Sequence, residues 1–200
     1  MPTALVAALL AGLVFQAAPV KVNRDKSEKE NKHWTILTVP AAAPYGNVLP
    51  ELRVECTQQE ETKQFMVEET NEFGVVLNAG PLRTDGDVVS LVVKLDGKQP
   101  ASHQWKESPD HKTYRYYAYP GSEPNRDPNL PSDARQALEE TRIQSDTSKF
   151  LDEIFSARTA VIEVQPAGGG AVVQVRFEVD GLRKEFDKYP ECKAYYRTPH

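Results

Sequence analysis

The segment AVIEVQPAGGGAVVQVRFEV, residues 160–179, decides the fold of this chain. Ala160–Val164 and Ala171–Val179 are rich in β-branched residues, and the second run alternates apolar with polar side chains. A period of two is typical of strands that bury one face. The glycines Gly168–Gly170 separate the two runs and suit a reversal of the chain. The segment therefore predicts a β-hairpin within an antiparallel sheet.

The same period of two recurs from Trp34 onward. It places Leu52, Val54 and Cys56 on one face of a strand, which we expect to point into the core. The dipeptide Asp96-Gly97 follows another such run and is typical of a tight hairpin turn. The further predicted strands cover residues 34–39, 65–67, 88–95 and 113–119. Their close spacing favours antiparallel meanders.

Helices are expected in one part of the chain, after a loop at residues 120–131 that is rich in proline. Ser132 is predicted to cap a short, charged helix that ends near Arg142. A second helix is predicted over residues 147–157, because its apolar residues recur at helical spacing and should pack on the sheet. The sequence thus predicts a mainly β fold: an antiparallel β-sandwich-like domain with one packed helix and a short extra helix.

An apolar stretch, Ala4–Phe15, opens the chain and is followed by small residues. It has the length of a signal-peptide core and falls short of the ~20 residues that a membrane-spanning helix needs. Residues 1–18 are therefore predicted to be a signal peptide, which leaves no stable membrane span after cleavage. An uncleaved anchor or a buried strand is the alternative, because no Lys or Arg precedes the apolar run.

Residues 19–33 mix positive and negative charges and contain little that is apolar. This composition predicts a charged flexible linker. The remaining residues, 34–200, are enough for a single β-rich domain with its own core. The net charge of -5, with Lys and Arg interleaved among Asp and Glu, makes nucleic acid an unexpected partner.

Two cysteines, Cys56 and Cys192, stand near the two ends of the predicted domain. In an exported protein such a pair indicates a disulfide. The core-facing position of Cys56 argues against a nucleophilic thiol. We therefore predict a Cys56–Cys192 disulfide and a periplasmic or secreted location.

No pattern in the sequence predicts catalysis, a cofactor or a metal. His103 and His111 lie near Asp110, but they flank a polar turn, whereas metal ligands are usually held on firm elements. Adjacent glutamates such as Glu68 and Glu69 diverge on a strand or a helix and cannot converge on one substrate. The chain is predicted not to be an enzyme. A hydrolase whose site is assembled from distant residues is the remaining alternative.

The order of several short motifs carries a family resemblance. The motifs are Leu52–Cys56, Val93–Gly97 followed by Trp105, Phe150-Leu151, Ile154–Ala157, Phe177–Leu182 and the terminal Cys192. In this order the chain resembles the VasI/TagO-like periplasmic proteins associated with type VI secretion. The resemblance implies an exported cell-envelope accessory protein that acts by protein contact and has no established catalytic role.

A tyrosine-rich stretch is the best candidate for partner binding. Its residues are Tyr114, Arg115, Tyr116, Tyr117 and Tyr119. On a strand Tyr114 and Tyr116 share one face and the others share the opposite face, so both faces cannot be buried in one core. Tyr and Arg recur in interface hot spots. In the alternative interpretation, one face packs in the core and the other covers a neighbouring loop.

These observations predict an exported accessory or adaptor protein that binds another envelope or secreted protein. A periplasmic inhibitor or immunity-type protein that binds a secreted hydrolase is the alternative function.

Overall fold

A computed structural model describes residues 19–28, 31–63, 66–84, 86–117, 131–193 and 195. The predicted signal peptide, Tyr119 and all but the last residue of the loop at 120–131 lie outside these residues. Within the described part of the chain, no helix is both long enough and apolar enough to cross a membrane.

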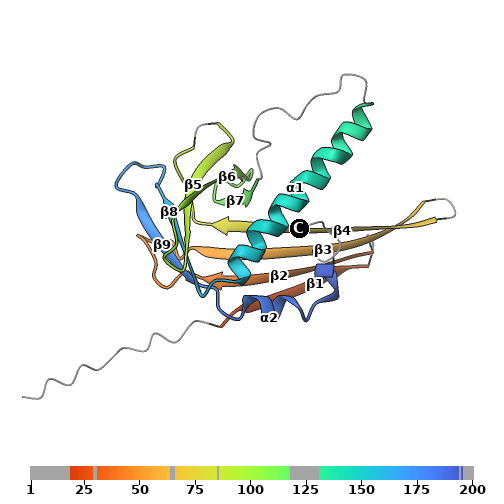
Figure 1. The fold of residues 1–200 in the computed structure, drawn as a ribbon, viewed down its shortest axis with the longest axis horizontal. Coiled ribbons are helices and arrows are strands. Elements are labelled where there is room, and N and C mark those ends of the chain that lie inside the picture. The colour runs from red at the N-terminus through yellow and green to blue at the C-terminus, as the bar shows by residue number, and fades with distance from the viewer. Residues whose placement is uncertain are drawn as a thin grey trace, which may run out of the picture.

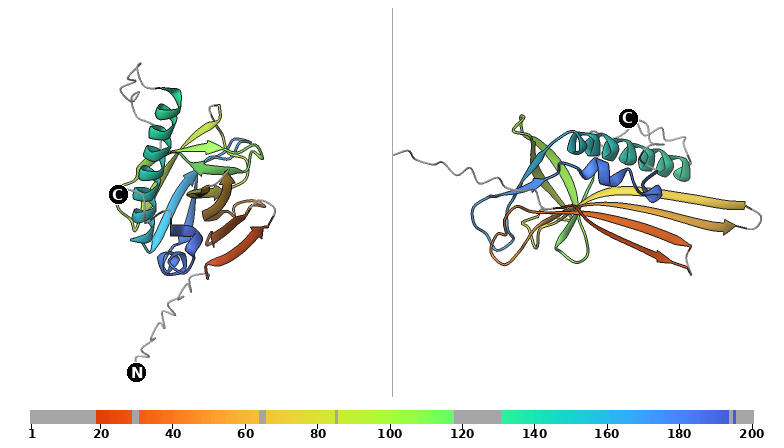
Figure 2. Two further views of the ribbon diagram at one scale, coloured as in Figure 1. Left: turned by 90° about the vertical axis from the view of Figure 1, so that its right-hand side faces the viewer. Right: turned by 90° about the horizontal axis from the view of Figure 1, so that it is seen from below.

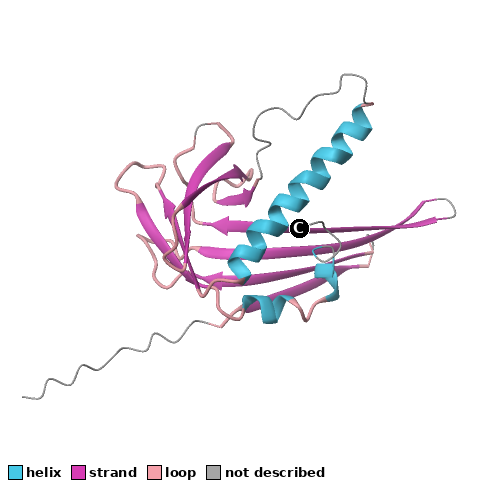
Figure 3. Ribbon diagram, viewed as in Figure 1, coloured by secondary structure: helices cyan, strands magenta, loops and turns pink. Residues whose placement is uncertain are grey.

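The described strands form one antiparallel sheet (Figures 1 and 3). They are β1 (Lys21–Ser27), β2 (Lys32–Pro40), β3 (Glu51–Lys63), β4 (Met66–Asn78), β5 (Val88–Leu95), β6 (Ala101–Glu107), β7 (Thr113–Tyr116), β8 (Thr159–Val164) and β9 (Val173–Glu178). Their order across the sheet is β1-β2-β3-β4-β7-β6-β5-β8-β9. The long β3–β4 hairpin extends beyond the rest of the sheet (Figure 1). The predicted mainly β, antiparallel fold with a packed helix is confirmed.

The sheet bends back on itself, so that its last strand meets the end of β2. Ala41 forms a β-bridge with Phe177 of β9, and the Ala42 N–H donates to the Arg176 carbonyl at 2.8 Å. The strands therefore belong to one curved sheet that is nearly closed, instead of to two separate sheets. Its concave side encloses apolar residues from almost every strand, including Leu37, Val54 and Phe177.

The helices cover one face of the long strands (Figure 2). They are α1 (Ser132–Phe155), α2 (Leu182–Phe186) and the 3-10 helix η1 (Pro190–Lys193). The buried residues of α1 lie in its C-terminal half, and they are Thr147, Ser148, Phe150, Leu151 and Ile154. At this spacing one helical stripe packs on the sheet, as predicted for residues 147–157.

The predicted break between two helices is wrong, because α1 is continuous from Ser132 to Phe155. No Gly or Pro stands between Arg142 and Thr147 to end the first helix. The predicted cap is also wrong. Pro131 occupies the N-cap position, Ser132 is already helical, and no side-chain capping hydrogen bond forms.

The predicted hairpin at residues 160–179 is confirmed by β8 and β9, which pair from Thr159↔Glu178 to Val164↔Val173. The Asp96-Gly97 turn is also confirmed, since both residues have positive φ angles and connect β5 to β6. The sequence pattern does not predict β6 or most of β4. In β6 only Trp105 is buried, so the strand lacks an apolar alternation.

The predicted flexible linker at residues 19–33 is wrong for the described residues. Lys21–Ser27 form β1, and every one of them is paired with β2. This strand has no apolar period because its side chains are nearly all exposed. Backbone pairing and a contact with η1 hold it instead of core burial.

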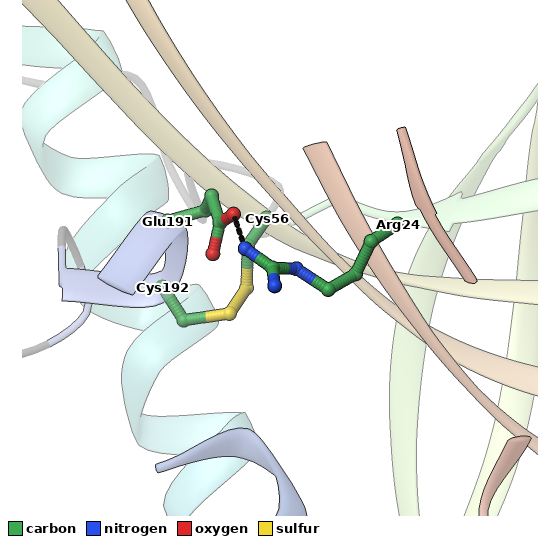
Figure 4. Close-up of a disulfide and its surroundings, with 4 residues drawn as sticks. All are labelled: Arg24, Cys56, Glu191 and Cys192. Carbon is green, nitrogen blue, oxygen red and sulfur yellow. Dashed lines mark hydrogen bonds and ion pairs between the residues drawn. A yellow bond between two sulfur atoms is a disulfide. The ribbon is translucent and has the colours of Figure 1, made fainter. Parts of the chain in front are cut away.

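The predicted disulfide between Cys56 and Cys192 is confirmed, with a Cα–Cα distance of 5.0 Å across a sequence separation of 136. Both cysteines are fully buried. The Arg24 guanidinium of β1 donates to the carboxylate of Glu191, which precedes Cys192 (Figure 4). Arg24 also lies over the Tyr189 ring, 5.2 Å from its centroid. The disulfide and this ion pair together fasten η1 to β3 and β1.

Candidate functional site

The tyrosine-rich stretch predicted to bind a partner begins in β7, and its first residue is part of the core. Tyr114 is fully buried, and its hydroxyl accepts the Leu82 N–H at 2.7 Å. Burial raises the pKa of Tyr114 to about 12. Tyr114 therefore holds β7 to the neighbouring loop, and its predicted place on a binding surface is wrong.

Arg115 lies on the opposite face of β7 and is paired with Glu55 of β3 at 2.7 Å. Its guanidinium crosses directly over Gly74 of β4, where an added Cβ would come within 2.1 Å of an Arg115 nitrogen. Half of the Arg115 side chain is exposed. Arg115 is thus a surface residue on the face of β7 opposite to Tyr114 and Tyr116.

Tyr116 packs against α1. Its ring stacks on Phe150 with centroids 4.2 Å apart and planes 10° apart, and it meets Trp105 edge-on at 5.8 Å. The His103 ring lies 4.6 Å from Phe150 and 5.7 Å from Tyr116. These contacts join β6, β7 and α1 through one aromatic cluster. Tyr116 is only half-buried, so one side of the cluster is open.

That open side is a groove of about 280 Å³ between β6, β7 and α1. We call it the α1 groove. It is lined by Ser102, His103, Gln104, Tyr116, Tyr117, Asp146, Lys149, Phe150 and Glu153. The Tyr117 N–H donates to the Gln104 carbonyl at 2.9 Å, which continues the β6–β7 pairing beyond the end of β7. The structure thus brings Tyr116 and Tyr117 together in the groove, while Tyr119 lies outside the described residues.

The α1 groove is weakly acidic. Asp146 and Glu153 line it together with Lys149, whose ammonium is 3.3 Å from Asp146. Burial lowers the pKa of His103, and the negative charge of Glu153 opposes this shift only in part. The lowered pKa favours the neutral imidazole. Burial, with smaller contributions from Asp146 and Glu153, raises the pKa of Tyr116 to about 12. The groove therefore combines two carboxylate side chains and one lysine with aromatic groups.

The groove does not arrange these groups for nucleophilic catalysis. The Ser102 hydroxyl bonds to Ser90 at 2.6 Å, and among the described residues no hydrogen bond joins His103 to a serine or a carboxylate. A nucleophile, a base and a group that orients the base are the usual minimum for acyl transfer. The volume of the groove is below that of most small-molecule pockets and is suited to one or two side chains.

The His103, His111 and Asp110 cluster considered from sequence is dispersed. His111 lies in the turn before β7, 3.3 Å from Glu107, and Asp110 accepts hydrogen bonds from Lys112 and Thr113. His103 lies in the α1 groove instead. Across the described ranges, no three His, Cys, Asp or Glu side chains gather closely enough to hold a metal ion.

The groove residues that α1 and β6 contribute were not predicted from the sequence. A partial signal exists in α1, because Asp146, Lys149, Phe150 and Glu153 follow each other at helical spacing and share one face. In β6, His103 shares the face of the buried Trp105. The sequence does not show that these two faces meet.

Comparison of the chain with models of protein families, with curated protein sequences and with solved structures gives no match.

Proposed function

We propose that this protein is an exported accessory protein of the cell envelope that binds another protein in the α1 groove. The observation that carries the proposal is the pair Tyr116 and Tyr117 on the wall of a groove that is only large enough for one or two side chains. Tyrosines supply much contact area while losing little conformational entropy, and they recur at the centres of protein interfaces.

The groove also indicates the chemistry of the partner. Asp146 and Glu153 outweigh Lys149 in charge, and the tyrosine rings beside them can face a cation. A Lys or Arg side chain on the partner satisfies both features. We therefore expect the partner to insert a basic residue, and we expect binding to weaken as ionic strength rises.

The buried Cys56–Cys192 disulfide supports the proposed location, because disulfides persist in oxidising compartments. The disulfide therefore favours a periplasmic or secreted location. The link to type VI secretion rests on the resemblance to VasI/TagO-like proteins and stays a prediction.

Site-directed photo-crosslinking in the native host tests the proposal. A photoreactive amino acid at Gln104, inside the α1 groove, is expected to give a discrete adduct with one protein. The same group at Lys94, an exposed residue of β5 outside the groove, is the positional control. Adducts of equal yield and identity from both positions would contradict a specific site.

A charge-reversal pair tests the partner chemistry. Glu153→Lys is expected to lower the yield of the Gln104 adduct about tenfold, because it reverses the charge of the groove. Glu140→Lys makes the same change at an exposed position of α1 outside the groove and should leave the yield unchanged. Identification of the partner as a secreted hydrolase that this protein inhibits would instead favour the immunity-type function.

A further inference from the structure

We propose that β9 presents a second binding surface, where an extended segment of another protein adds a strand to the sheet. The surface is the groove between the Ala42–Tyr45 segment and β9, which we call the β9 groove. It has a volume of about 450 Å³ and is separate from the α1 groove in its lining residues.

The backbone groups of β9 point alternately toward β8 and away from it. The Val179 N–H donates to Arg158 on the β8 side, whereas the Arg176 carbonyl accepts the Ala42 N–H on the opposite side. Because these directions alternate along a strand, the N–H and C=O of Gln174 also point away from β8, into the β9 groove. Among the described residues no backbone group pairs with Gln174 on that side.

A short stretch of chain already pairs with β9 on this side and then leaves it. Ala41 and Ala42 pair with Phe177 and Arg176, and the chain then turns away at Ala43 and Pro44. An added strand would continue this short ladder along the open part of β9. Unpaired edge groups of this kind are what β-augmentation uses for affinity.

The opposite wall of the β9 groove is held in place by hydrogen bonds. Tyr45 and Val48 exchange backbone hydrogen bonds of 2.9 and 3.0 Å, and the Tyr45 hydroxyl donates to the Ala79 carbonyl. A preformed wall lowers the entropic cost of ordering a peptide. The peptide would lie between this wall and β9 without requiring a large rearrangement.

The lining of the β9 groove identifies the class of segment. Pro44, Tyr45, Val173 and Val175 give it apolar walls, and the nearby Val172 is 56% exposed. Arg176 and Glu178 neutralise each other at 2.7 Å. The expected occupant is therefore an uncharged, extended segment in which small or β-branched residues alternate with polar ones.

The test uses the oxidised, full-length protein and a fluorescein-labelled peptide, Thr-Val-Thr-Val-Thr-Val-Thr, followed by fluorescence anisotropy. Gln174→Pro removes the N–H that faces the groove without removing a β8–β9 hydrogen bond, since proline is tolerated at such edge positions. It should weaken peptide binding at least tenfold. Gln174→Ala keeps the backbone groups and should bind within twofold of the original protein. Circular dichroism and melting temperature establish that both variants fold.

A second probe does not depend on any variant. The same peptide with its central Val residues N-methylated loses the donors that pair with a strand edge, and it should also bind at least tenfold more weakly. The proposal is overturned if the unmodified peptide does not bind at millimolar concentration, or if N-methylation leaves its affinity unchanged.

It is also overturned if Gln174→Pro binds as well as Gln174→Ala, or if the edge is occupied by a second copy of this chain in a concentration-dependent dimer. The α1 groove is unaffected by these changes, so its proposed partner is tested separately.

Discussion

The strands β1 and β9 stand at the two ends of the sheet, yet their sequences and supports differ. β1 carries Lys21, Arg24 and Lys26 and buries almost no side chain. β9 buries Val175 and Phe177, and its free edge faces a groove. Both strands approach the same strand, because β1 pairs with β2 and β9 bridges to Ala41 directly after β2.

The difference shows two ways in which a sheet can end. Positive charges along an edge oppose the addition of another strand, and β1 has this composition. In β9 the positive charge of Arg176 is paired with Glu178, and the strand borders a preformed apolar wall. One edge is therefore protected, while the other is suited to binding. The following predictions test whether this contrast holds.

Removing the disulfide should have the largest effect on the stability of the whole domain. In the chain-entropy model a bridge that spans 136 residues contributes about 5 kcal/mol, less any strain. The Cys56→Ser/Cys192→Ser double variant is expected to lose about 4–5 kcal/mol of unfolding free energy and to melt about 10–20 °C lower. Denaturant titration and calorimetry measure both quantities, and the oxidised protein should show no free thiol.

Hydrogen exchange of that double variant tests the comparison itself. Amides of β1 and η1 should lose protection before those of β8 and β9, because the disulfide holds η1 and η1 holds Arg24. An equal loss of protection in β1 and β9 would show that the two ends of the sheet are not supported independently.

Removing the ion pair at β1 should have an intermediate effect. Arg24→Met leaves the Glu191 carboxylate buried without its cation, since only 5% of that side chain is exposed. We expect a loss of about 1–2 kcal/mol, because Arg24 is half-exposed and water screens the pair. Lys26→Met is the matched control on the same strand, where the partner Glu28 is exposed, and it should be nearly neutral.

The effect of Arg24→Met should depend on pH. Burial alone would raise the pKa of Glu191, but the hydrogen bond and charge of Arg24 leave that pKa below its ordinary value of 4.5. Because the folded-state pKa is lowered, the stabilisation is fully present above pH 4.5 and is lost as the pH falls through the folded-state pKa. Denaturant unfolding should be measured from pH 3 to 7 for the original protein and for Arg24→Met. The difference between their unfolding free energies should become smaller toward pH 3. A difference in unfolding free energy that is constant with pH would mean that the ion pair is not its cause.

The two ends of the sheet also show how far the sequence predicts the fold. β8 and β9 are predictable, because Val173, Val175 and Phe177 alternate with polar residues and bury one face. β1 is not predictable, because it is held by backbone pairing and by Arg24 on Glu191, 167 residues away. Composition alone makes such a segment resemble a linker.

The candidate site divides in the same manner. The place of Tyr116 and Tyr117 in a candidate site is predictable, because one strand carries more tyrosines than a core can bury. The disulfide is predictable from the number and positions of the cysteines, Cys56 and Cys192. The remaining walls of the α1 groove come from α1 and β6. These two elements meet only in the folded protein, and no local sequence pattern shows their contact. The break expected after Arg142 also separated Asp146 from its helix, so the shared face of Asp146 and Glu153 was overlooked.

The smallest change in stability is expected from a pair of surface variants, one on each edge. Val22 of β1 and Val172 beside β9 are both exposed, so Val22→Lys and Val172→Lys should each alter the unfolding free energy by less than about 0.5 kcal/mol. Their effects on the Thr-Val peptide should differ. Val172→Lys places a charge beside the β9 groove and should weaken binding several-fold, whereas Val22→Lys adds a charge to an edge that already carries several and should change nothing. Equal effects of the two variants in the anisotropy titration would mean that the β9 edge is no more receptive to a strand than the β1 edge.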